Sequence, residues 1–253
     1  MSVPRVLQID AGNSGIKWRS LRGDRVSERG VAELNSEAEM HCLRAQVRSV
    51  DEVWLASVLA ADSESALLGA LLLDESVILR RAATRAQCAG VRNSYAEPER
   101  MGVDRWLVLL AARARCATRV CVVDAGTALT IDWLAADGQH EGGYIIPGPG
   151  LMEQALFSGT GRVRVSDAGA WSKAPGTDTA SAVGSGITLA LSGALREALH
   201  SDADLRHEAA PPDHILVTGG YGQSLMTSLP LRAEYVQDLV FEGLEIAVRD
   251  DMA

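Results

Sequence analysis

Apolar and polar positions alternate along the first part of the chain. Residues 6–9 form a largely apolar run, and residues 15–21 alternate between apolar and polar side chains before the polar turn at 22–24. A period of two is typical of β-strands, so the opening predicts a β-meander. Helical and strand patterns then follow one another at 37–48, 53–58, 64–73 and 77–79. This alternation predicts an α/β fold.

A segment without a period precedes a clear amphipathic helix. Residues 86–103 contain Gly90, Pro98 and Gly102, which predicts a surface loop. From Asp104 onward the apolar residues fall on one helical face, at positions 106, 107, 110, 111 and 114. We therefore expect a helix that begins at Asp104 and leads into a second apolar strand.

An aspartate and a glycine turn end each of the two apolar strands. The first strand runs into Asp10-Ala11-Gly12-Asn13, and the second runs into Asp124-Ala125-Gly126-Thr127. The aspartates are 124 minus 10, or 114, residues apart, and each turn is followed by a returning strand with a tryptophan. This repetition predicts two related half-domains, residues 1–115 and 116–253, that face each other across a cleft.

The second half of the chain is predicted to repeat the order of strands and helices of the first half, with longer helices. Residues 142–150 are rich in glycine and proline, so we expect them to be irregular. A long helix is predicted from about Thr179 to Leu199, and each glycine in its body costs roughly 1 kcal/mol relative to alanine. Close helix packing or the approach of a ligand is expected to offset that cost. Further elements are expected at 151–158 (helix), 215–218 (strand) and 241–248 (helix).

Composition and charge exclude several classes of protein. The 253 residues include 47% hydrophobic side chains, enough for a sizeable core, and the net charge of -9 without a run of Lys or Arg disfavours a nucleic-acid surface. The longest apolar run, 106–112, is far shorter than the ~20 residues that span a bilayer, and the N-terminus has no signal-peptide pattern. We expect a cytoplasmic protein that binds neither nucleic acid nor membrane. The cysteines at 42, 88, 116 and 121 form no C-x-x-C pair, so reduced thiols are expected.

The two aspartate turns suggest a site for a polyphosphate. A carboxylate at the end of a buried strand is costly unless it meets a cation or several donors, and two at matching positions favour a shared magnesium-bound nucleotide. Gly12 and Gly126 allow the backbone to approach phosphate oxygens, and Lys17 on the returning strand supplies a counter-charge. The alternative is that both turns are ordinary hairpins.

Three further segments are open to two interpretations. Asp104 could orient a substrate hydroxyl in phosphoryl transfer, or it could be a helix N-cap. Arg105 could pair with a carboxylate or a phosphate, or it could be an exposed arginine at the start of a helix. Gly219 and Gly220 follow a strand, where they could admit a flat base or form a plain turn.

Five motifs follow one another along nearly the whole chain. They are Asp10-Ala11-Gly12-Asn13-Ser14 with Lys17-Trp18, Gly102-Val103-Asp104-Arg105-Trp106, Asp124-Ala125-Gly126-Thr127-Ala128, Gly142-Gly143-Tyr144-Ile145-Ile146-Pro147-Gly148 and Thr218-Gly219-Gly220. Taken together, these motifs resemble the type III pantothenate kinases. The Gly-x-Asp-Arg-Trp segment between the two aspartate turns is specific to that family, whereas the others are shared across the actin-like ATPase superfamily.

The resemblance implies a fold and an activity. The fold would be α/β, with duplicated ribonuclease H-like half-domains whose mixed five-stranded sheets are flanked by helices. The activity would be transfer of the γ-phosphoryl group of ATP to the primary hydroxyl of pantothenate, the first step of coenzyme A biosynthesis. Mg²⁺ and a monovalent cation, K⁺ or NH₄⁺, would be required, and the enzyme would be a homodimer.

The resemblance also implies a role for each matching residue. Asp104 would be the catalytic base, Asp124 would bind the monovalent cation, and Asp10 would bind magnesium through water. Thr179 would contact the substrate from the neighbouring subunit, so that the dimer shares its active sites. The ATP-binding residues would be Asp10, Ala11, Gly12, Asn13, Ser14, Gly15, Ile16, Lys17, Thr127, Gly219 and Gly220. The pantothenate pocket would comprise Tyr95, Gly102, Val103, Asp104, Arg105 and Thr179.

One departure and two alternatives accompany the resemblance. Tyr221 stands where the family often has an aspartate after the paired glycines, which affects the expected adenosine contacts. A transcriptional accessory protein with weak or no catalysis is one alternative, against which the acidic charge argues if DNA contact is direct. Another small-molecule kinase or a phosphatase of the superfamily would need both aspartate turns, but not Tyr95 and residues 102–105.

Overall fold

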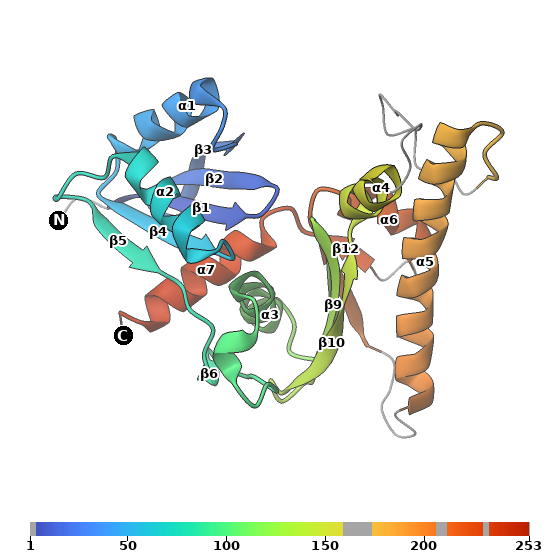
Figure 1. Cartoon of the computed structure of the whole chain (residues 1–253). Helices are drawn as coiled ribbons and strands as arrows, with labels where there is room; N and C mark the ends of the chain where they lie inside the picture. The colour runs from blue at the N-terminus through green and yellow to red at the C-terminus, as the bar shows by residue number, and fades with distance from the viewer. Residues whose placement is uncertain (1–3, 159–173, 206–211, 230–232, 253) are drawn as a thin grey trace. The chain divides into compact units, whose positions relative to one another are not determined.

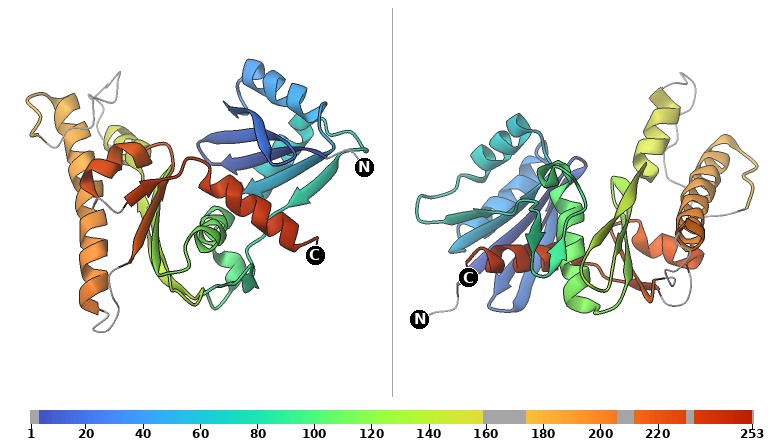
Figure 2. Two further views of the ribbon diagram at one scale, coloured as in Figure 1. Left: turned by 180° about the vertical axis from the view of Figure 1, so that it is seen from behind. Right: turned by 90° about the horizontal axis from the view of Figure 1, so that it is seen from below.

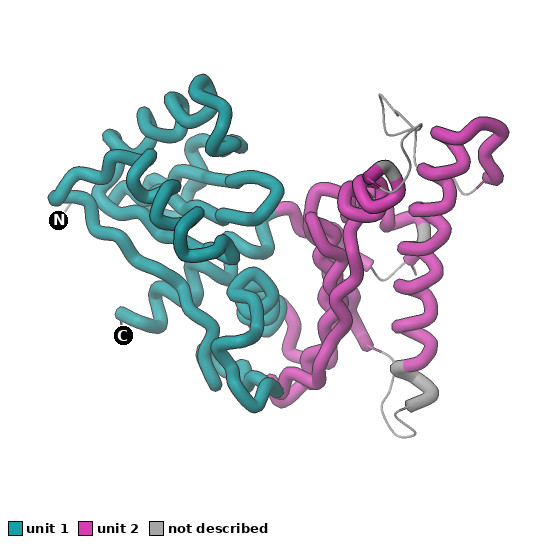
Figure 3. The backbone as a smooth tube through the Cα atoms, in the orientation of Figure 1, with its two compact units in different colours: residues 1–114, 238–253 teal, residues 115–237 magenta. Residues whose placement is uncertain are grey.

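The chain forms two compact units in the computed structural model (Figure 3). The structure describes residues 4–158, 174–205, 212–229 and 233–252. The first unit comprises Met1–Ala114 and Asp238–Ala253, and the second comprises Arg115–Gln237. The first boundary lies beside the expected one, but the C-terminal helix belongs to the first unit, whereas we expected it in the second. The polar contacts that hold this helix to the first sheet account for the difference.

The first unit is built on a five-stranded sheet whose opening strands form the expected β-meander (Figure 1). The strand order is β3-β2-β1-β4-β5. Strand β1 pairs with β2 antiparallel and with β4 parallel, so β1 lies at the centre. The strands are β1 (Arg5–Gly12), β2 (Gly15–Arg22), β3 (Arg25–Ala32), β4 (Glu52–Ser57) and β5 (Ile78–Arg81).

Helices cover both faces of this sheet (Figure 2). Leu7 and Ile9 of β1 pack with buried residues of α1 (Glu37–Val47) and α2 (Ala61–Leu71), whereas Gln8 points to the opposite face and contacts α7 (Leu239–Asp250). Helix α3 (Val103–Arg115) packs closely on α7, because a side chain at Gly243 would collide with the backbone of Leu107. Short elements fill the segment before α3: β6 (Gln87–Cys88), β7 (Val91–Arg92) and η1 (Pro98–Arg100).

The second unit has the same strand plan, which confirms the predicted duplication. Its sheet has the order β10-β9-β8-β11-β12, so β8 occupies the place that β1 has in the first unit. β8 is antiparallel to β9 and parallel to β11, as β1 is to β2 and β4. The strands are β8 (Val120–Ala125), β9 (Ala128–Leu134), β10 (His140–Pro147), β11 (His214–Thr218) and β12 (Ala233–Tyr235).

Helices complete the second unit. Ile187, Leu191 and Leu195 of the long helix α5 pack against one face of the sheet. A Cβ at Gly186 or Gly193 would meet no atom within 4 Å in the described part of the chain, so the close packing expected at these glycines is absent there. The helices are α4 (Pro149–Ser158), α5 (Thr179–Leu205), α6 (Gly222–Leu225) and η2 (Met226–Ser228).

Strand β10 corrects the expectation that residues 142–150 are irregular. Pairing with β9 continues to Pro147, with one register shift between His140 and Gly142, and Gly142 has a φ of 108°. A side chain at Gly143 would collide with Asp132 and with the carbonyl oxygen of Ile131. The glycines therefore permit a bulge and a close strand approach, and do not end the strand.

Two composition-based expectations can be compared with the described residues. Cys42, Cys88, Cys116 and Cys121 form no disulfide in the described part of the chain, and all except Cys42 are buried. None of the helices in the described ranges combines the length and the apolar character needed to cross a bilayer.

Candidate active site

The first aspartate turn is a two-residue hairpin between β1 and β2. Gly12 pairs with Gly15, and Asn13 and Ser14 form the turn. The backbone of this segment is therefore an ordinary hairpin, as the alternative interpretation predicted. Asp10 lies two residues before Gly12, the last residue of β1, and directly opposite Lys17 in the antiparallel ladder. Directly opposite residues have Cβ atoms about 4.5–5.5 Å apart. The hairpin therefore brings one carboxylate and one ammonium together near the end of the first strand.

The surroundings of Asp10 raise its pKa. Burial raises the pKa of Asp10 to about 6, the Lys17 ammonium opposes this rise, and the negative charge of Asp104 adds to it. The carboxylates of Asp10 and Asp104 therefore interact, although 94 residues separate them (104 minus 10). Asp10 is thus a buried carboxylate whose ionisation a second carboxylate opposes and a lysine favours, so a bound cation would stabilise its charged form.

Asp104 lies inside the first turn of α3, which begins at Val103. The amide of Trp106 donates to the carbonyl oxygen of Gly102 at 3.1 Å, so Gly102 precedes the helix and the N-cap interpretation of Asp104 is wrong. The Asp104 Oδ1 atom accepts from the amide of Arg105 at 2.8 Å. This bond fixes one carboxylate oxygen near the positive end of a helix, where negative charge is favoured.

Arg105 is buried, with 4% of its surface exposed, so the interpretation as an exposed arginine is wrong. Its Nη1 atom donates to the hydroxyl of Tyr95 at 2.8 Å, and its guanidinium carbon lies 5.7 Å from the centre of the Tyr95 ring. Asn93 fixes this tyrosine by accepting from its amide at 2.9 Å. Tyr95 and Arg105, which the resemblance assigned to one pocket, thus meet directly.

The second aspartate turn repeats the first. β8 ends at Ala125, β9 begins at Ala128, and the amide of Gly126 donates to the carbonyl oxygen of Ala128 at 2.9 Å. Asp124 lies two residues before the turn, opposite Thr130 on β9, as Asp10 lies opposite Lys17. The equivalence of Asp10 and Asp124 predicted from the sequence therefore holds in strand position.

Gly219 closes over this second turn. It has a φ of 87°, and a Cβ at this position would lie 2.5 Å from both Asp124 Oδ1 and the Ala125 carbonyl oxygen. The amide of Tyr221 donates to the same carbonyl oxygen at 3.0 Å. Gly220 has open space around its Cα within the described residues. Gly219 is thus required by the packing, whereas a side chain at Gly220 would have room among the described residues.

Gly148 is a site residue that the sequence reasoning did not single out. Its amide donates to the carbonyl oxygen of Thr127 at 2.9 Å, and a Cβ at Gly148 would collide with the backbone of Gly126 and Thr127. The Pro-Gly-Pro-Gly run at 147–150 was the available signal. The second turn is therefore held between β10 and β11 by one glycine on each side.

Thr179, which the resemblance assigned to the pantothenate pocket, is the first residue of α5 in the second unit. It lines an apolar groove of ≈ 740 Å³ between α4 and α5, together with Pro147, Leu151, Leu156 and Gly186. The lining of this groove includes none of the residues of the second aspartate turn. Within the second unit, Thr179 therefore belongs to this groove and not to the second aspartate turn.

Comparison with known proteins decides the family. The family model of type III pantothenate kinases matches residues 6–201. The chain belongs to the type III pantothenate kinase family. It is 38% identical over 247 residues to the type III pantothenate kinase of Pseudomonas aeruginosa, covering 96% of this chain and 98% of that protein. It is also 38% identical over 249 residues to the enzyme of the same name from Thiobacillus denitrificans, with 98% of each chain covered.

Solved structures share the fold of this family member. A Campylobacter jejuni protein described as a Baf family transcriptional activator has a TM-score of 0.57 and 20% identity, over 97% of this chain and 98% of that chain. A 2-dehydro-3-deoxygalactonokinase protein from Sinorhizobium meliloti has a TM-score of 0.56 and 15% identity, over 96% and 98%. At these identities the likeness concerns the fold alone, and it confirms the predicted α/β architecture.

The donor groups fit the cations that a kinase of this family would use. The described residues contain no group of three or more His, Cys, Asp or Glu side chains arranged around a metal position. Magnesium in phosphoryl-transfer sites is typically bound by one or two carboxylates together with substrate phosphates and water. Asp10 supplies one such carboxylate. Beside Asp124, the buried hydroxyl of Thr130 has no hydrogen-bond partner in the described structure, which leaves an oxygen donor for a cation.

Proposed function

We propose that this protein phosphorylates pantothenate with ATP and forms 4'-phosphopantothenate, the first step of coenzyme A biosynthesis. The observation that carries this proposal is the match of residues 6–201 to the type III pantothenate kinase family, a range that includes both aspartate turns and the Gly-x-Asp-Arg-Trp segment. In the reaction, the primary hydroxyl oxygen of pantothenate bonds to the γ-phosphorus while the bond to the bridging oxygen breaks, and ADP leaves.

Asp104 is the catalytic residue in this proposal. Its carboxylate accepts a hydrogen bond from the pantothenate hydroxyl, orients it toward the γ-phosphorus and receives its proton as the new bond forms. A loose transition state requires little proton transfer early in the reaction, so orientation is the main contribution. The bond from the Arg105 amide leaves the second carboxylate oxygen, Oδ2, to face the substrate.

The triphosphate is bound by the two aspartate turns. In the first, the amides of residues 12–16 and the side chains of Asn13, Ser14 and Lys17 face the phosphate oxygens, and Asp10 would hold Mg²⁺ through water. In the second, Thr127 contacts the phosphates, while Gly219 and Gly220 form part of the adenosine site. When bound, Mg²⁺ would supply positive charge that offsets the charge of the phosphates and of the leaving ADP. The expectation that the two half-domains share one cleft is part of this proposal.

Arg105 and Tyr95 form the recognition site for pantothenate. A guanidinium matches a carboxylate in charge and geometry, and pantothenate carries one carboxylate. Tyr95 holds the guanidinium in place through its hydroxyl. Gly102 and Val103 complete the pocket through their backbone.

Asp124 binds a monovalent cation, K⁺ or NH₄⁺. Such an ion balances triphosphate charge at a site where Lys17 is the single lysine among the predicted ATP-binding residues. Support comes from the Asp124 carboxylate and the adjacent Thr130 hydroxyl, which lacks a hydrogen-bond partner in the described structure.

The enzyme acts in the cytoplasm as a homodimer that shares its active sites. The apolar groove between α4 and α5 is open in one copy of the chain, and Leu151 and Leu156 on its wall are 41% and 48% exposed. Gly186 removes side-chain bulk from α5 at this groove. A second copy of the chain would cover these surfaces and would place its Thr179 at the neighbouring pantothenate site.

One assay tests the proposed function. ATP consumption is measured with pantothenate and with a panel of hydroxy acids and sugars, each in potassium and in sodium buffer with magnesium. We expect turnover with pantothenate, faster in potassium, and a product heavier by one phosphoryl group in mass spectrometry. Turnover with a sugar instead would indicate another kinase of the superfamily. No turnover with any acceptor would favour the accessory-protein alternative.

A further inference from the structure

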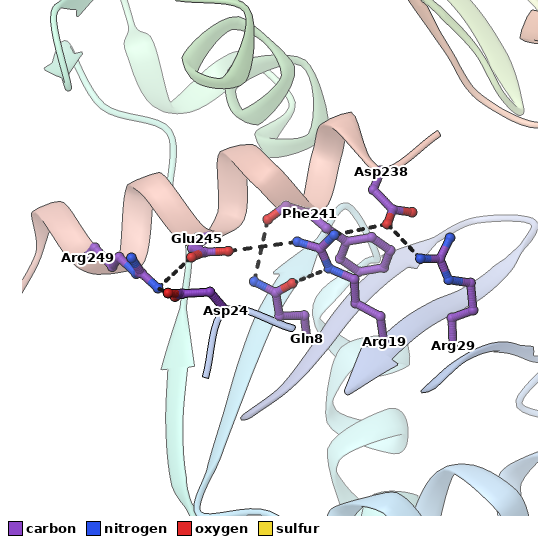
Figure 4. Close-up of polar contacts among 8 residues, drawn as sticks. All are labelled: Gln8, Arg19, Asp24, Arg29, Asp238, Phe241, Glu245 and Arg249. Atoms are coloured by element: carbon purple, nitrogen blue, oxygen red, sulfur yellow. Dashed lines mark hydrogen bonds and ion pairs between the residues drawn. The ribbon is translucent and has the colours of Figure 1, made fainter. Parts of the chain in front are cut away.

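Three polar residues form a row across the first sheet, on the face that α7 covers (Figure 4). Gln8 of β1 lies opposite Arg19 of β2, and Arg19 lies opposite Arg29 of β3. The neighbouring pair on the same two strands is Asp10 and Lys17, two residues further along. Because side chains two residues apart point to the same face of a strand, the row adjoins the first phosphate turn directly.

Arg19 is the centre of this row. Its side chain is 7% exposed, its Nε donates to Gln8 Oε1 at 2.6 Å, and its Nη1 donates to Asp238 Oδ2 at 3.0 Å. Its Nη2 lies 3.9 Å from a carboxylate oxygen of Glu245, and its guanidinium carbon lies 5.0 Å from the centre of the Phe241 ring. Gln8 in turn donates to the carbonyl oxygen of Phe241 at 3.4 Å. A buried guanidinium with these partners holds β2 to the first turn of α7.

Asp238 occupies the N-cap position of α7, but its side chain does not cap the helix. Its carboxylate instead binds Arg19 at 3.0 Å and Arg29 at 3.3 Å. A capping hydrogen bond would stabilise the helix by about 1 kcal/mol. Because Asp238 does not form one, its contacts with the two arginines are its main structural role.

Asp238 is also the first residue of the chain after it leaves the second unit. The preceding residue, Gln237, belongs to the second unit, and its carbonyl oxygen accepts from the Thr218 hydroxyl at 3.5 Å. The Val236 amide donates to Val217 at 2.7 Å. Gln237 is therefore hydrogen-bonded to β11, the strand that precedes Gly219 in the second unit. The next residue, Asp238, is hydrogen-bonded to β2, the strand that carries Lys17 in the first unit.

We propose that Arg19 and Asp238 are positioning residues for ATP. They hold β2, and with it Lys17, to the residue at which the chain re-enters the first unit. This inference rests on the proposed role of Lys17 in phosphate binding. Loss of the Asp238 carboxylate would leave a buried guanidinium whose nearest remaining carboxylate is 3.9 Å away. The arginine and its strand would then shift, and Lys17 would lose its place opposite Asp10.

The test compares Asp238→Asn with the wild type by calorimetric titration of a nonhydrolysable ATP analogue in the presence of magnesium. We expect the dissociation constant to rise by roughly 2- to 30-fold, the range found for residues that act through their neighbours. In the kinase assay, the KM for ATP should rise by a similar factor, and the KM for pantothenate should stay within about twofold. A purely structural role would lower Tm without this split between the two KM values.

Two control variants separate positioning from stability. Leu244→Ala removes a fully buried side chain from the same helix, and Asp24→Asn breaks the exposed ion pair with Arg249 near the C-terminal end of α7. We expect Leu244→Ala to lower Tm at least as much as Asp238→Asn, and we expect both controls to bind the analogue as the wild type does. Equal weakening of binding in Leu244→Ala and Asp238→Asn would overturn the proposal.

Failure of this inference can be told apart from failure of the proposed function. Binding of the analogue does not depend on which acceptor is phosphorylated. If the wild type phosphorylates pantothenate but Asp238→Asn binds the analogue normally, only the positioning role is wrong. If Asp238→Asn binds weakly but pantothenate is not phosphorylated, the acceptor assignment fails and the positioning role stands. If the wild type binds no nucleotide, both are wrong.

Discussion

Gly102 leaves the space that the carboxylate of Asp104 occupies. A Cβ at residue 102 would lie 2.5 Å from Asp104 Oδ1 and 3.7 Å from its carboxyl carbon. Because the conflict is with the end of a side chain, Gly102→Ala should displace the carboxylate and leave the helix intact. A displacement of about 1 Å at a reacting group can lower the rate by ~10²-fold. We therefore predict a loss of kcat of that order, measured by the coupled assay.

Gly69→Ala is the matched control for this substitution. Gly69 lies in α2, and a Cβ there would meet nothing within 4 Å among the described residues. We expect unchanged kcat and a gain in the free energy of unfolding of roughly 0.5–1 kcal/mol. An unchanged kcat in Gly102→Ala would show that the exact place of the Asp104 carboxylate is unimportant.

Asp104→Asn tests the catalytic role itself. The amide keeps the size of the side chain and an oxygen for the Arg105 amide, but it cannot receive the hydroxyl proton. We predict that kcat falls by at least ~10²-fold, in line with general-base contributions. The affinity for the ATP analogue should hardly change. A fall in Tm with normal kcat would mean that Asp104 has only a structural role in α3.

Asp10 makes the stability of the free protein depend on pH. Its pKa is raised from the ordinary value of 3.8 to about 6 in the folded state, so between these values the folded state holds a proton that the unfolded state releases. The free energy of unfolding therefore falls as the pH rises through this window. Asp10→Asn removes the effect, so the variant should gain more in Tm over the wild type at pH 7.5 than at pH 4. An equal difference at both pH values would contradict this assignment.

Gly219 and Gly220 should respond differently to alanine. Gly219→Ala would force a side chain into a φ of 87° and against Asp124, whereas Gly220 has room for one. We predict that Gly219→Ala lowers the free energy of unfolding by about 1–3 kcal/mol. Gly220→Ala should leave Tm unchanged and raise the KM for ATP. Equal Tm values for the two variants would contradict the tight closure over the second turn.

The shared active site predicts that the monomer is inactive. Wild-type protein should sediment as two copies of a 26.9 kDa chain. Leu156→Arg places a charge on the apolar groove between α4 and α5, so it should yield monomers without kinase activity. Val31→Arg, at an exposed position on β3 of the first unit, is the control and should remain an active dimer. An active monomer would contradict the role given to Thr179.

The local sequence predicted the strand plan well, because each strand and turn carries its own signal. The alternation at 15–21 and the repeated Asp-x-Gly turn are properties of adjacent residues, and they correctly gave the meander and the equivalence of Asp10 and Asp124. The place of α7 could not be predicted in this way. It depends on Arg19 and Asp238, which are 219 residues apart.

Errors in the sequence interpretation have a common physical origin. The exposed alternative for Arg105 followed the usual exposure of arginine and is wrong, because the Tyr95 hydroxyl and ring provide partners for its buried guanidinium. Residues 142–147 looked irregular because glycine disfavours strands, but close contact of Gly143 with β9 requires its small size. In both cases a tertiary contact overrides the intrinsic preference of the residue.

The central claim is that one ATP molecule is held by both aspartate turns. A crystal structure of the protein with magnesium and a nonhydrolysable ATP analogue tests it most directly. We predict phosphate density against the backbone of residues 12–15 and within reach of Lys17, with the same triphosphate also in contact with Thr127. A triphosphate that contacts only one of the two turns, or neither, would contradict the claim.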